Sequence, residues 1–267
     1  MLDKFNREIN YLRISVTDRC NLRCTYCIPP GTILKEKENS LSDPEITEIV
    51  KNAVKIGIKK IRLTGGEPLL RKGIVSLVKR IRSVKGVEEL VMTTNGTLLK
   101  KYAKKLKENG LDRINISLDT LDPDKYRELV KLGEIESVLN GIDSVIDAGF
   151  KNTKLNMVLI PGFNDDEIGS MKKFCKKKSL NLQRINHYSL EDITSIDRKY
   201  EAERPLKCSL CNRIRLTSDG KLKPCLFSDI EIDVDFSDIE KSLKEAVLKK
   251  PCCGVANNTK GNWEIGG

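Results

Sequence analysis

The stretch Cys20-Asn21-Leu22-Arg23-Cys24-Thr25-Tyr26-Cys27 carries three cysteines in a C-x3-C-x2-C spacing. It follows an apparent strand at residues 11–16, so the cysteines fall on a loop at the end of a strand. Three thiolates this close in sequence can face a single point. A structural zinc site needs four protein ligands, whereas a 4Fe–4S cluster can take three and leave one iron open. The spacing alone therefore leaves two interpretations, an iron–sulfur cluster or a zinc site that takes its fourth ligand from elsewhere.

The overall composition limits the class of protein. The 267 residues suffice for one large α/β domain and a small appendage. Lys and Arg outnumber Asp and Glu by 48 to 38, which favours an anionic partner such as a nucleotide. No basic arm with interleaved aromatics is visible, so we do not expect nucleic acid as the partner. Without a signal peptide or a membrane-spanning run we expect a cytoplasmic protein, in which nine cysteines indicate metal or redox chemistry.

Apolar strands and amphipathic helices alternate after the first cysteine group. Ser42 and Glu45 form a capping box before a helix that Gly57 ends. Five further strands are expected near residues 60–64, 89–93, 113–117, 154–160 and 182–188, with helices between them. Such alternation predicts a parallel sheet, either open and doubly wound or a partial barrel, with ligands at the carboxyl ends of the strands. The rhythm breaks near residue 190, where we expect a domain boundary.

Short polar motifs follow three of these strands. Gly65, Gly66 and Glu67 follow the second strand. Two glycines there allow close approach of the backbone to a ligand, and either Glu67 or the nearby backbone can hydrogen-bond an ammonium group. Thr93 ends the third strand and Ser117 the fourth, and both supply groups that can bind a carboxylate or a ribose. Each motif alone is also ordinary turn chemistry. Their succession at neighbouring strand ends, together with the cysteines, indicates one binding site.

A second cysteine group lies in the irregular C-terminal part, in the spacing C-x2-C-x13-C. It consists of Cys208, Cys211 and Cys225. A fourth ligand from Cys252 or Cys253 would close a zinc or iron–sulfur site, and without it one iron is free for substrate. Arg213 and Arg215 are two residues apart, so in an extended segment both point the same way and suit a phosphate group. The alternative is a zinc ribbon with two surface arginines.

Four stretches, residues 5–20, 62–71, 162–167 and 211–227, resemble the GTP 3′,8-cyclase family of molybdenum-cofactor biosynthesis, within the radical S-adenosylmethionine (SAM) superfamily. The last two residues, Gly266 and Gly267, resemble the paired-glycine tail that reaches into that family's active site. The resemblance implies an α/β fold with a six-stranded parallel (βα)6 partial TIM barrel over residues 1–190. It also implies a small C-terminal cysteine-ligated iron–sulfur domain over residues 191–267.

The same resemblance implies the cofactors and the reaction. Two 4Fe–4S clusters would be bound, the first with SAM and the second with GTP through its open iron. A one-electron donor such as flavodoxin or ferredoxin would reduce the first cluster. The 5′-deoxyadenosyl radical would remove the ribose 3′ hydrogen of GTP, and C3′ would attack guanine C8. The implied SAM site comprises Tyr26, Gly66, Glu67, Thr93, Ser117 and Asn156. The implied GTP site comprises Arg13, Lys60, Arg62, Lys154, Arg213 and Arg215.

The chain departs from that family on the substrate side. The segment between Tyr188 and Cys208 is short, and Gln183 stands where a basic residue is expected. Two alternatives therefore stay open, namely a radical SAM enzyme with one auxiliary cluster acting on a peptide or another small molecule, and a zinc-binding nucleic-acid protein. The sequence leaves the electron donor and the oligomeric state open, a homodimer being one candidate.

Overall fold

The computed structural model describes residues 1–34, 40–196 and 199–266. Its core is a nine-stranded sheet in the order β6-β5-β4-β3-β2-β1-β7-β8-β9. Strands β1 to β6 all run parallel to their neighbours, as the alternation of strands and helices predicted. Their bounds are β1 Tyr11–Ser15, β2 Lys60–Thr64, β3 Glu89–Thr94, β4 Arg113–Ser117, β5 Lys154–Leu159 and β6 Asn181–Asn186.

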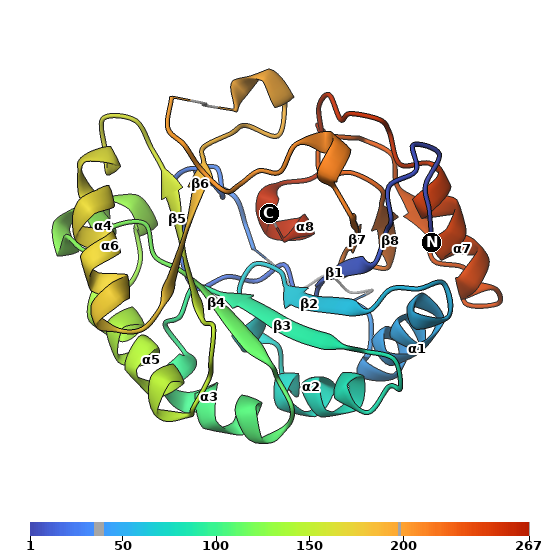
Figure 1. The fold of residues 1–267 in the computed structure, drawn as a ribbon, viewed down its shortest axis with the longest axis horizontal. Coiled ribbons are helices and arrows are strands. Elements are labelled where there is room, and N and C mark those ends of the chain that lie inside the picture. Colours follow the sequence, from blue (N-terminus) through green and yellow to red (C-terminus); the bar gives the residue numbers. More distant parts are fainter. Residues whose placement is uncertain (35–39, 197–198, 267) are drawn as a thin grey trace.

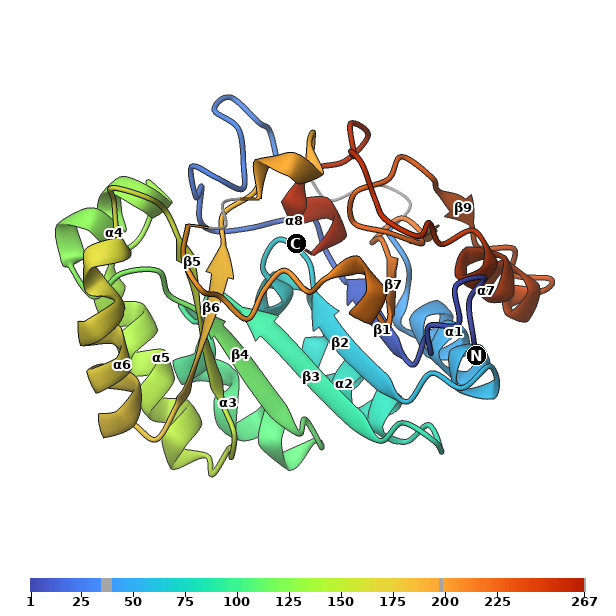
Figure 2. The same cartoon turned by 45° about the horizontal axis from the view of Figure 1, so that its top comes forward.

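Helices cover the convex face of this curved sheet (Figure 1). They connect successive parallel strands, and the view from a second direction shows the same single outer layer (Figure 2). None of the helices in the described ranges is both long and apolar enough to cross a membrane. The helices of this layer are α1 Asp43–Lys55, α2 Ile74–Arg82, α3 Leu99–Glu108, α4 Pro123–Val130, α5 Ile135–Asp147 and α6 Ile168–Lys177.

The first helix begins and ends as its sequence predicts. The N–H of Ser42 donates to Glu45 Oε2 at 2.7 Å, and the N–H of Glu45 donates to Ser42 Oγ at 3.4 Å. The two groups satisfy backbone donors that have no partner inside the helix. Gly57 follows the helix with φ +94°, a conformation that residues with a Cβ rarely adopt. The capping box and the glycine stop are therefore confirmed.

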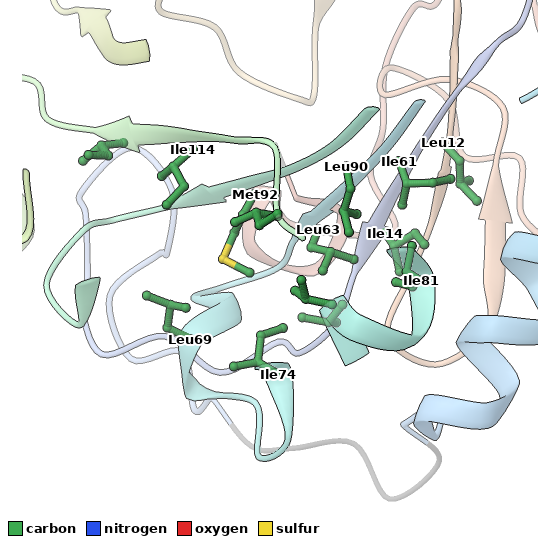
Figure 3. Packing of buried hydrophobic residues seen from close by; sticks show 14 of the residues in the cluster. Leu12, Ile14, Ile61, Leu63, Leu69, Ile74, Ile81, Leu90, Met92 and Ile114 are labelled. Atoms are coloured by element: carbon green, nitrogen blue, oxygen red, sulfur yellow. The ribbon is translucent and has the colours of Figure 1, made fainter. Parts of the chain in front are cut away.

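The two faces of the sheet differ in polarity. Alternate residues such as Leu12, Ile61 and Met92 point to the outer face and are fully buried against α2 and its neighbours (Figure 3). The other residues of the same strands, such as Arg13 and Arg62, are polar and lie on the inner face. Parallel sheets are usually covered by helices on both faces. Here the inner face is instead left for a cavity.

The C-terminal part extends the same sheet. Strand β7 (Arg213–Leu216) pairs in parallel with β1, and β8 (Lys221–Lys223) and β9 (Ile232–Asp233) follow it in antiparallel pairing. Helix α7 (Ile239–Leu248) packs on α1, and the short helix α8 (Asn262–Ile265) lies inside the curve of the sheet (Figure 1). The sequence predicted an extended segment around the two arginines but not that it would join β1.

Candidate functional site

A single cavity of about 1210 Å³ lies on the inner face of the sheet. Both cysteine groups line it, the first from the loop after β1 and the second from the C-terminal part. Small-molecule pockets usually measure 300–1,000 Å³, so this cavity has room for more than one ligand. Every residue predicted for the two clusters, the SAM site or the GTP site lines it except Glu67, whereas Gly266 of the predicted tail does not.

The first cysteine group consists of largely buried thiols. Burial raises the pKa of Cys20 to about 11 and of Cys27 to about 12, and it raises the pKa of Cys24 well above its usual range. Such thiols stay protonated at neutral pH unless a positively charged metal takes the place of the proton. The N–H of Leu22 (3.4 Å) and the side-chain amide of Asn95 (3.9 Å) already point at Cys20 Sγ. The donor set thus fits the iron of a cluster.

The two glycines after β2 hold the loop that leads to these cysteines. A Cβ on Gly65 would lie 2.3 Å from the carbonyl oxygen of Thr17, and one on Gly66 would lie 2.4 Å from that of Arg19. The N–H of Gly66 donates to Thr17 O at 2.8 Å, and the N–H of Glu67 donates to Arg19 O at 2.7 Å. The close approach that the glycines allow is therefore first an approach to the chain's own backbone.

Glu67 was predicted to line the SAM site, but the structure places it behind the cavity wall. Its side chain is fully buried and does not line the cavity. Its carboxylate accepts hydrogen bonds from Thr94 Oγ1 (2.7 Å) and from the N–H groups of Asn95 (2.7 Å) and Leu69 (3.0 Å). Burial raises its pKa to about 7 although these donors oppose the rise. Because Asn95 in turn faces Cys20, Glu67 positions the strand ends around the first cysteine group.

The polar strand ends converge on the cavity as predicted. Thr93, Ser117 and Asn156 line it from β3, β4 and β5. Asn156 Oδ1 is buried and has no hydrogen-bond partner among the described residues, so it is available to a ligand donor. Tyr26 donates its hydroxyl to Asp119 Oδ2 at 2.8 Å, and burial raises the pKa of this carboxyl to about 6. The loop after β1 and the end of β4 are thereby fixed to one another.

Basic side chains form a floor across β2, β1 and β7, set by the strand register. Tyr11 on β1 pairs with Lys60 on β2 and with Arg213 on β7. Two residues further along, Arg13 pairs with Arg62 and Arg215, so all six side chains share the inner face. Around the described cavity, eleven Lys and Arg face one acidic residue, Glu201. This excess of positive over negative side chains in the cavity lining favours a strongly anionic ligand.

Several of these cations already have partners. Lys60 and Arg113 both pair with Glu89, and Arg62 donates to Thr93 Oγ1 at 2.8 Å. By contrast, Arg62 Nε and Arg213 Nε are buried and have no hydrogen-bond partner in the described part of the chain. Burial, and then the charges of Arg113 and Arg204, lower the pKa of Lys154. The predicted GTP residues are therefore brought together, with donors left over for an anion.

Arg215 differs from the neighbouring arginines because it binds the C-terminal tail of the chain. Its guanidinium is buried and donates to the carbonyl oxygens of Ile265 (3.1 Å) and Gly266 (2.9 Å). The predicted C-terminal tail thus reaches the inner face of the sheet, where a Cβ on Gly266 would lie 2.1 Å from Thr64 Cγ2. The other predicted tail residue, Gly267, lies outside the described residues. Arg215 therefore holds the tail against the inner face of the sheet.

The second cysteine group lies beside Lys250 at the opposite side of the floor. Burial opposes ionisation of Cys211, but the charges of Lys250 and Arg213 outweigh it and lower the pKa of this thiol. In the described ranges, no three His, Cys, Asp or Glu side chains converge tightly enough to hold a single metal ion. Zinc needs such convergence, with sulfur ligands at about 2.3 Å, whereas a 4Fe–4S cluster binds each cysteine through a different iron. Each group offers the three thiols that a 4Fe–4S cluster can use.

Two functional candidates escaped the sequence analysis, Tyr11 and Arg204. Tyr11 Oη is buried and has no hydrogen-bond partner among the described residues, and Lys60, Arg62 and Arg213 all lie within 5.7 Å of its ring centroid. Its alternation with Arg13 on one strand was a signal for the shared face. Arg204 lines the cavity because its backbone forms an isolated β-bridge with Ile185. No local sequence pattern predicts this tertiary contact.

A family model of the radical SAM superfamily matches residues 14–175, more than half of the chain. The chain therefore belongs to the radical SAM superfamily. Its relatives narrow this class. The GTP 3′,8-cyclase of Alkaliphilus oremlandii (strain OhILAs) is 41% identical over 298 residues, covering 94% of this chain and 93% of the relative. The GTP 3′,8-cyclase of Peptoclostridium acidaminophilum is 44% identical over 280 residues, covering 88% and 85%. Within the superfamily, the chain belongs to the GTP 3′,8-cyclase family.

Solved structures agree on the fold. Streptococcus suis SuiB bound to its precursor peptide SuiA superimposes with a TM-score of 0.73 at 18% identity, covering 92% of this chain and 66% of SuiB. Native anSMEcpe with bound AdoMet gives 0.64 at 16% identity, covering 91% and 81%. At such identities the similarity establishes the α/β fold alone.

Proposed function

We propose that this chain is a radical SAM lyase that cyclises GTP to 3′,8-cyclo-7,8-dihydro-GTP, the first step of molybdopterin cofactor biosynthesis. The observation that carries the proposal is the single cavity that both cysteine groups line, with a basic floor between them. In this proposal one end of the cavity binds SAM and the other binds a nucleoside triphosphate. Family membership supports GTP as that nucleotide.

Cys20, Cys24 and Cys27 hold the first 4Fe–4S cluster in this proposal. When bound, this cluster would supply the one electron that cleaves SAM into methionine and the 5′-deoxyadenosyl radical. The chain's own contribution is orientation, because Gly66, Thr93, Ser117 and Asn156 surround the space next to the cysteines. Tyr26 shares this wall, and its bond to Asp119 keeps the cysteine loop against the strand ends. Glu67 acts through Asn95 and does not touch SAM.

The triphosphate of GTP lies on the basic floor in this proposal. Arg13, Lys60, Arg62, Lys154 and Arg213 neutralise its charge, and Arg215 keeps the C-terminal tail beside it. Guanidinium groups suit this task because they bind phosphate oxygens through two parallel hydrogen bonds. Cys208, Cys211 and Cys225 would hold a second 4Fe–4S cluster, whose open iron would bind the guanine. A buried cation without an anionic partner has an unfavourable desolvation free energy. The negative charge of the triphosphate would offset it.

The remaining features of the proposal follow from this assignment. The parallel strands form a partial (βα)6 barrel over residues 1–190, and residues 191–267 form the region that binds the second cluster and the substrate. A protein such as flavodoxin or ferredoxin donates the electron. The enzyme acts in the cytoplasm.

One alternative keeps the superfamily but changes the substrate. SuiB, whose fold this chain shares, is solved with a precursor peptide, and Gln183 leaves one expected cation of the GTP site missing. The second alternative, a zinc-binding nucleic-acid protein, is disfavoured by membership of the radical SAM superfamily. A test distinguishes all three. Anaerobically reconstituted, reduced protein is mixed with SAM and GTP, and 5′-deoxyadenosine and the cyclised nucleotide are measured by liquid chromatography.

The proposal expects both products, with nucleotide formed only when GTP and SAM are present together. Deoxyadenosine without any GTP-derived product would exclude GTP as the substrate and leave the radical SAM class standing. A colourless protein that binds zinc and forms neither product would favour the nucleic-acid alternative.

A further inference from the structure

We propose that Cys253 is a fourth cysteine ligand of the auxiliary iron–sulfur site, beside Cys208, Cys211 and Cys225. The inference rests on the proposed function only in taking this site to hold a 4Fe–4S cluster. Cys253 Sγ lies 2.9 Å from Cys208 Sγ, and all four cysteines line the same cavity. The next residue touches a third member of the group, since a Cβ on Gly254 would lie 2.8 Å from Cys225 Sγ.

A buried arginine keeps Cys253 beside the group. Arg7 donates to the carbonyl oxygen of Cys208 (2.9 Å) on one loop, and to those of Cys252 (2.9 Å) and Pro251 (2.6 Å) on the other. Asp3 fixes this guanidinium from behind through a bond of 2.6 Å to its Nε. One rigid, charged fork therefore ties the two loops together, which is the geometry that a ligand from a distant part of the chain needs.

A second buried cation supports the same segment. Lys250 Nζ donates to the carbonyl oxygen of Arg213 (2.9 Å), two residues after Cys211, and to that of Pro224 (2.8 Å), the residue before Cys225. Beyond the cysteines, the N–H of Val255 donates to Phe227 O at 2.9 Å. Residues 250–255 are thus attached at both ends to the segments that carry the other ligands.

The two adjacent cysteines are not equivalent. Cys253 Sγ contacts Cys208 Sγ, whereas among the described residues no hydrogen bond of the Cys252 thiol is seen. Both thiols are exposed, so Cys253 can turn away from Cys208 to reach a separate iron. Four cysteines are the number that closes a 4Fe–4S cluster, while three leave one iron for another ligand. Cys253 and the nucleotide therefore compete for the same iron.

The test uses the full-length chain with Cys20, Cys24 and Cys27 replaced by alanine, reconstituted anaerobically so that only the auxiliary cluster forms. A cluster held by three cysteines loses its fourth iron on mild oxidation with ferricyanide and gives the electron paramagnetic resonance signal of a 3Fe–4S cluster. We expect the parent to resist this conversion and Cys253→Ala to give a signal at least about tenfold stronger. Cys252→Ala, the matched control, should behave like the parent.

Conversion of the parent to the same extent as Cys253→Ala would overturn the proposal, and so would a Cys208–Cys253 disulfide found by mass spectrometry in the reconstituted chain. If Cys253→Ala binds no cluster, the result for the parent protein is sufficient by itself. A cluster with four cysteine ligands resists oxidation by ferricyanide, and a cluster with three does not. GTP binding by equilibrium dialysis adds a second readout, with tighter binding expected for Cys253→Ala. These results are independent of product formation by the unaltered enzyme, which tests the proposed function.

Discussion

Arg204 brings a cation to the part of the cavity where Gln183 leaves a neutral side chain. It reaches the site through backbone pairing with β6, where its carbonyl oxygen accepts from the N–H of Asn186 at 2.9 Å. Burial, and then the charge of Arg213, lower the pKa of its guanidinium to about 10, and its Nη1 is buried without a hydrogen-bond partner among the described residues. A buried guanidinium nitrogen without a hydrogen-bond partner is energetically unfavourable, and an anionic ligand would remove this cost.

Replacement of this arginine should therefore weaken nucleotide binding. A hydrogen bond to a charged group contributes about 1.5–3 kcal/mol, so Arg204→Gln should raise the KM for GTP by about tenfold or more. The KM for SAM should not change. Arg184→Gln is the matched control, because Arg184 is paired with Glu203 at 2.8 Å and does not line the cavity. Equal effects of the two substitutions on the KM for GTP would contradict the role of Arg204.

Tyr11 should make nucleotide binding depend on pH. Burial alone would raise its pKa, but the charges of Arg62, Arg13 and Arg213 outweigh burial and lower it to about 8. Above that pH the phenolate neutralises part of the floor, and an anionic ligand then binds only when the proton returns. The Kd for GTP should rise by up to about tenfold from pH 7 to pH 9. Tyr11→Phe cannot ionise, so it should bind GTP equally at both pH values in equilibrium dialysis; a retained rise would exclude Tyr11 as its source.

The residues that sequence reasoning found differ physically from those that it missed. The cysteine spacing and the alternation of Arg213 and Arg215 are local sequence patterns. In the structure these residues all line one cavity. Glu67 belongs to a local motif as well, but its hydrogen bonds to Thr94 and Asn95 depend on a neighbouring strand. Arg204 depends on a tertiary bridge within an irregular segment. Roles that arise from contacts between strands cannot be read from spacing.

At the scale of elements, the turn after β2 supports the loop after β1. The two segments meet closely through their backbones, since Gly66 leaves no room for a side chain against Arg19 O and Asp18 O. Strand ends that meet at one edge of a parallel sheet allow this contact. The glycine pair therefore acts on the first cysteine group through the position of the loop.

Gly66→Ala should disturb this loop and with it the first cluster. The new Cβ would lie 2.4 Å from Arg19 O, which only a shift of the backbone can relieve. We expect the iron content of the first site to fall by at least about half, and the free energy of unfolding to fall by about 1–3 kcal/mol. Gly169→Ala is the control, because no atom lies within 4 Å of its added Cβ and a helix position favours alanine. A Gly66→Ala protein with full iron content and unchanged SAM binding would contradict this role.

At the scale of the molecule, the alternation of apolar strands and helices was enough to predict six parallel strands. The C-terminal strands were not predictable in the same way, because β7 has only four residues and its partner β1 lies about 200 positions earlier in the chain. Their addition brings Arg213 and Arg215 next to Tyr11 and Arg13. The basic floor is therefore a product of the whole topology.

The N-terminal segment closes this arrangement, since Asp3 and Arg7 form a buried ion pair that joins the start of the chain to the loops of the second cysteine group. Breaking a buried pair costs about 3–5 kcal/mol because it leaves one charge without a partner. Asp3→Ala should therefore lower the free energy of unfolding in urea by that amount and release iron from the second site before the first. Asp124→Ala, which removes an exposed partner of Arg127, should cost less than about 1 kcal/mol. Loss of iron from both sites in parallel would show that Asp3 stabilises the whole sheet and has no particular link to the second group.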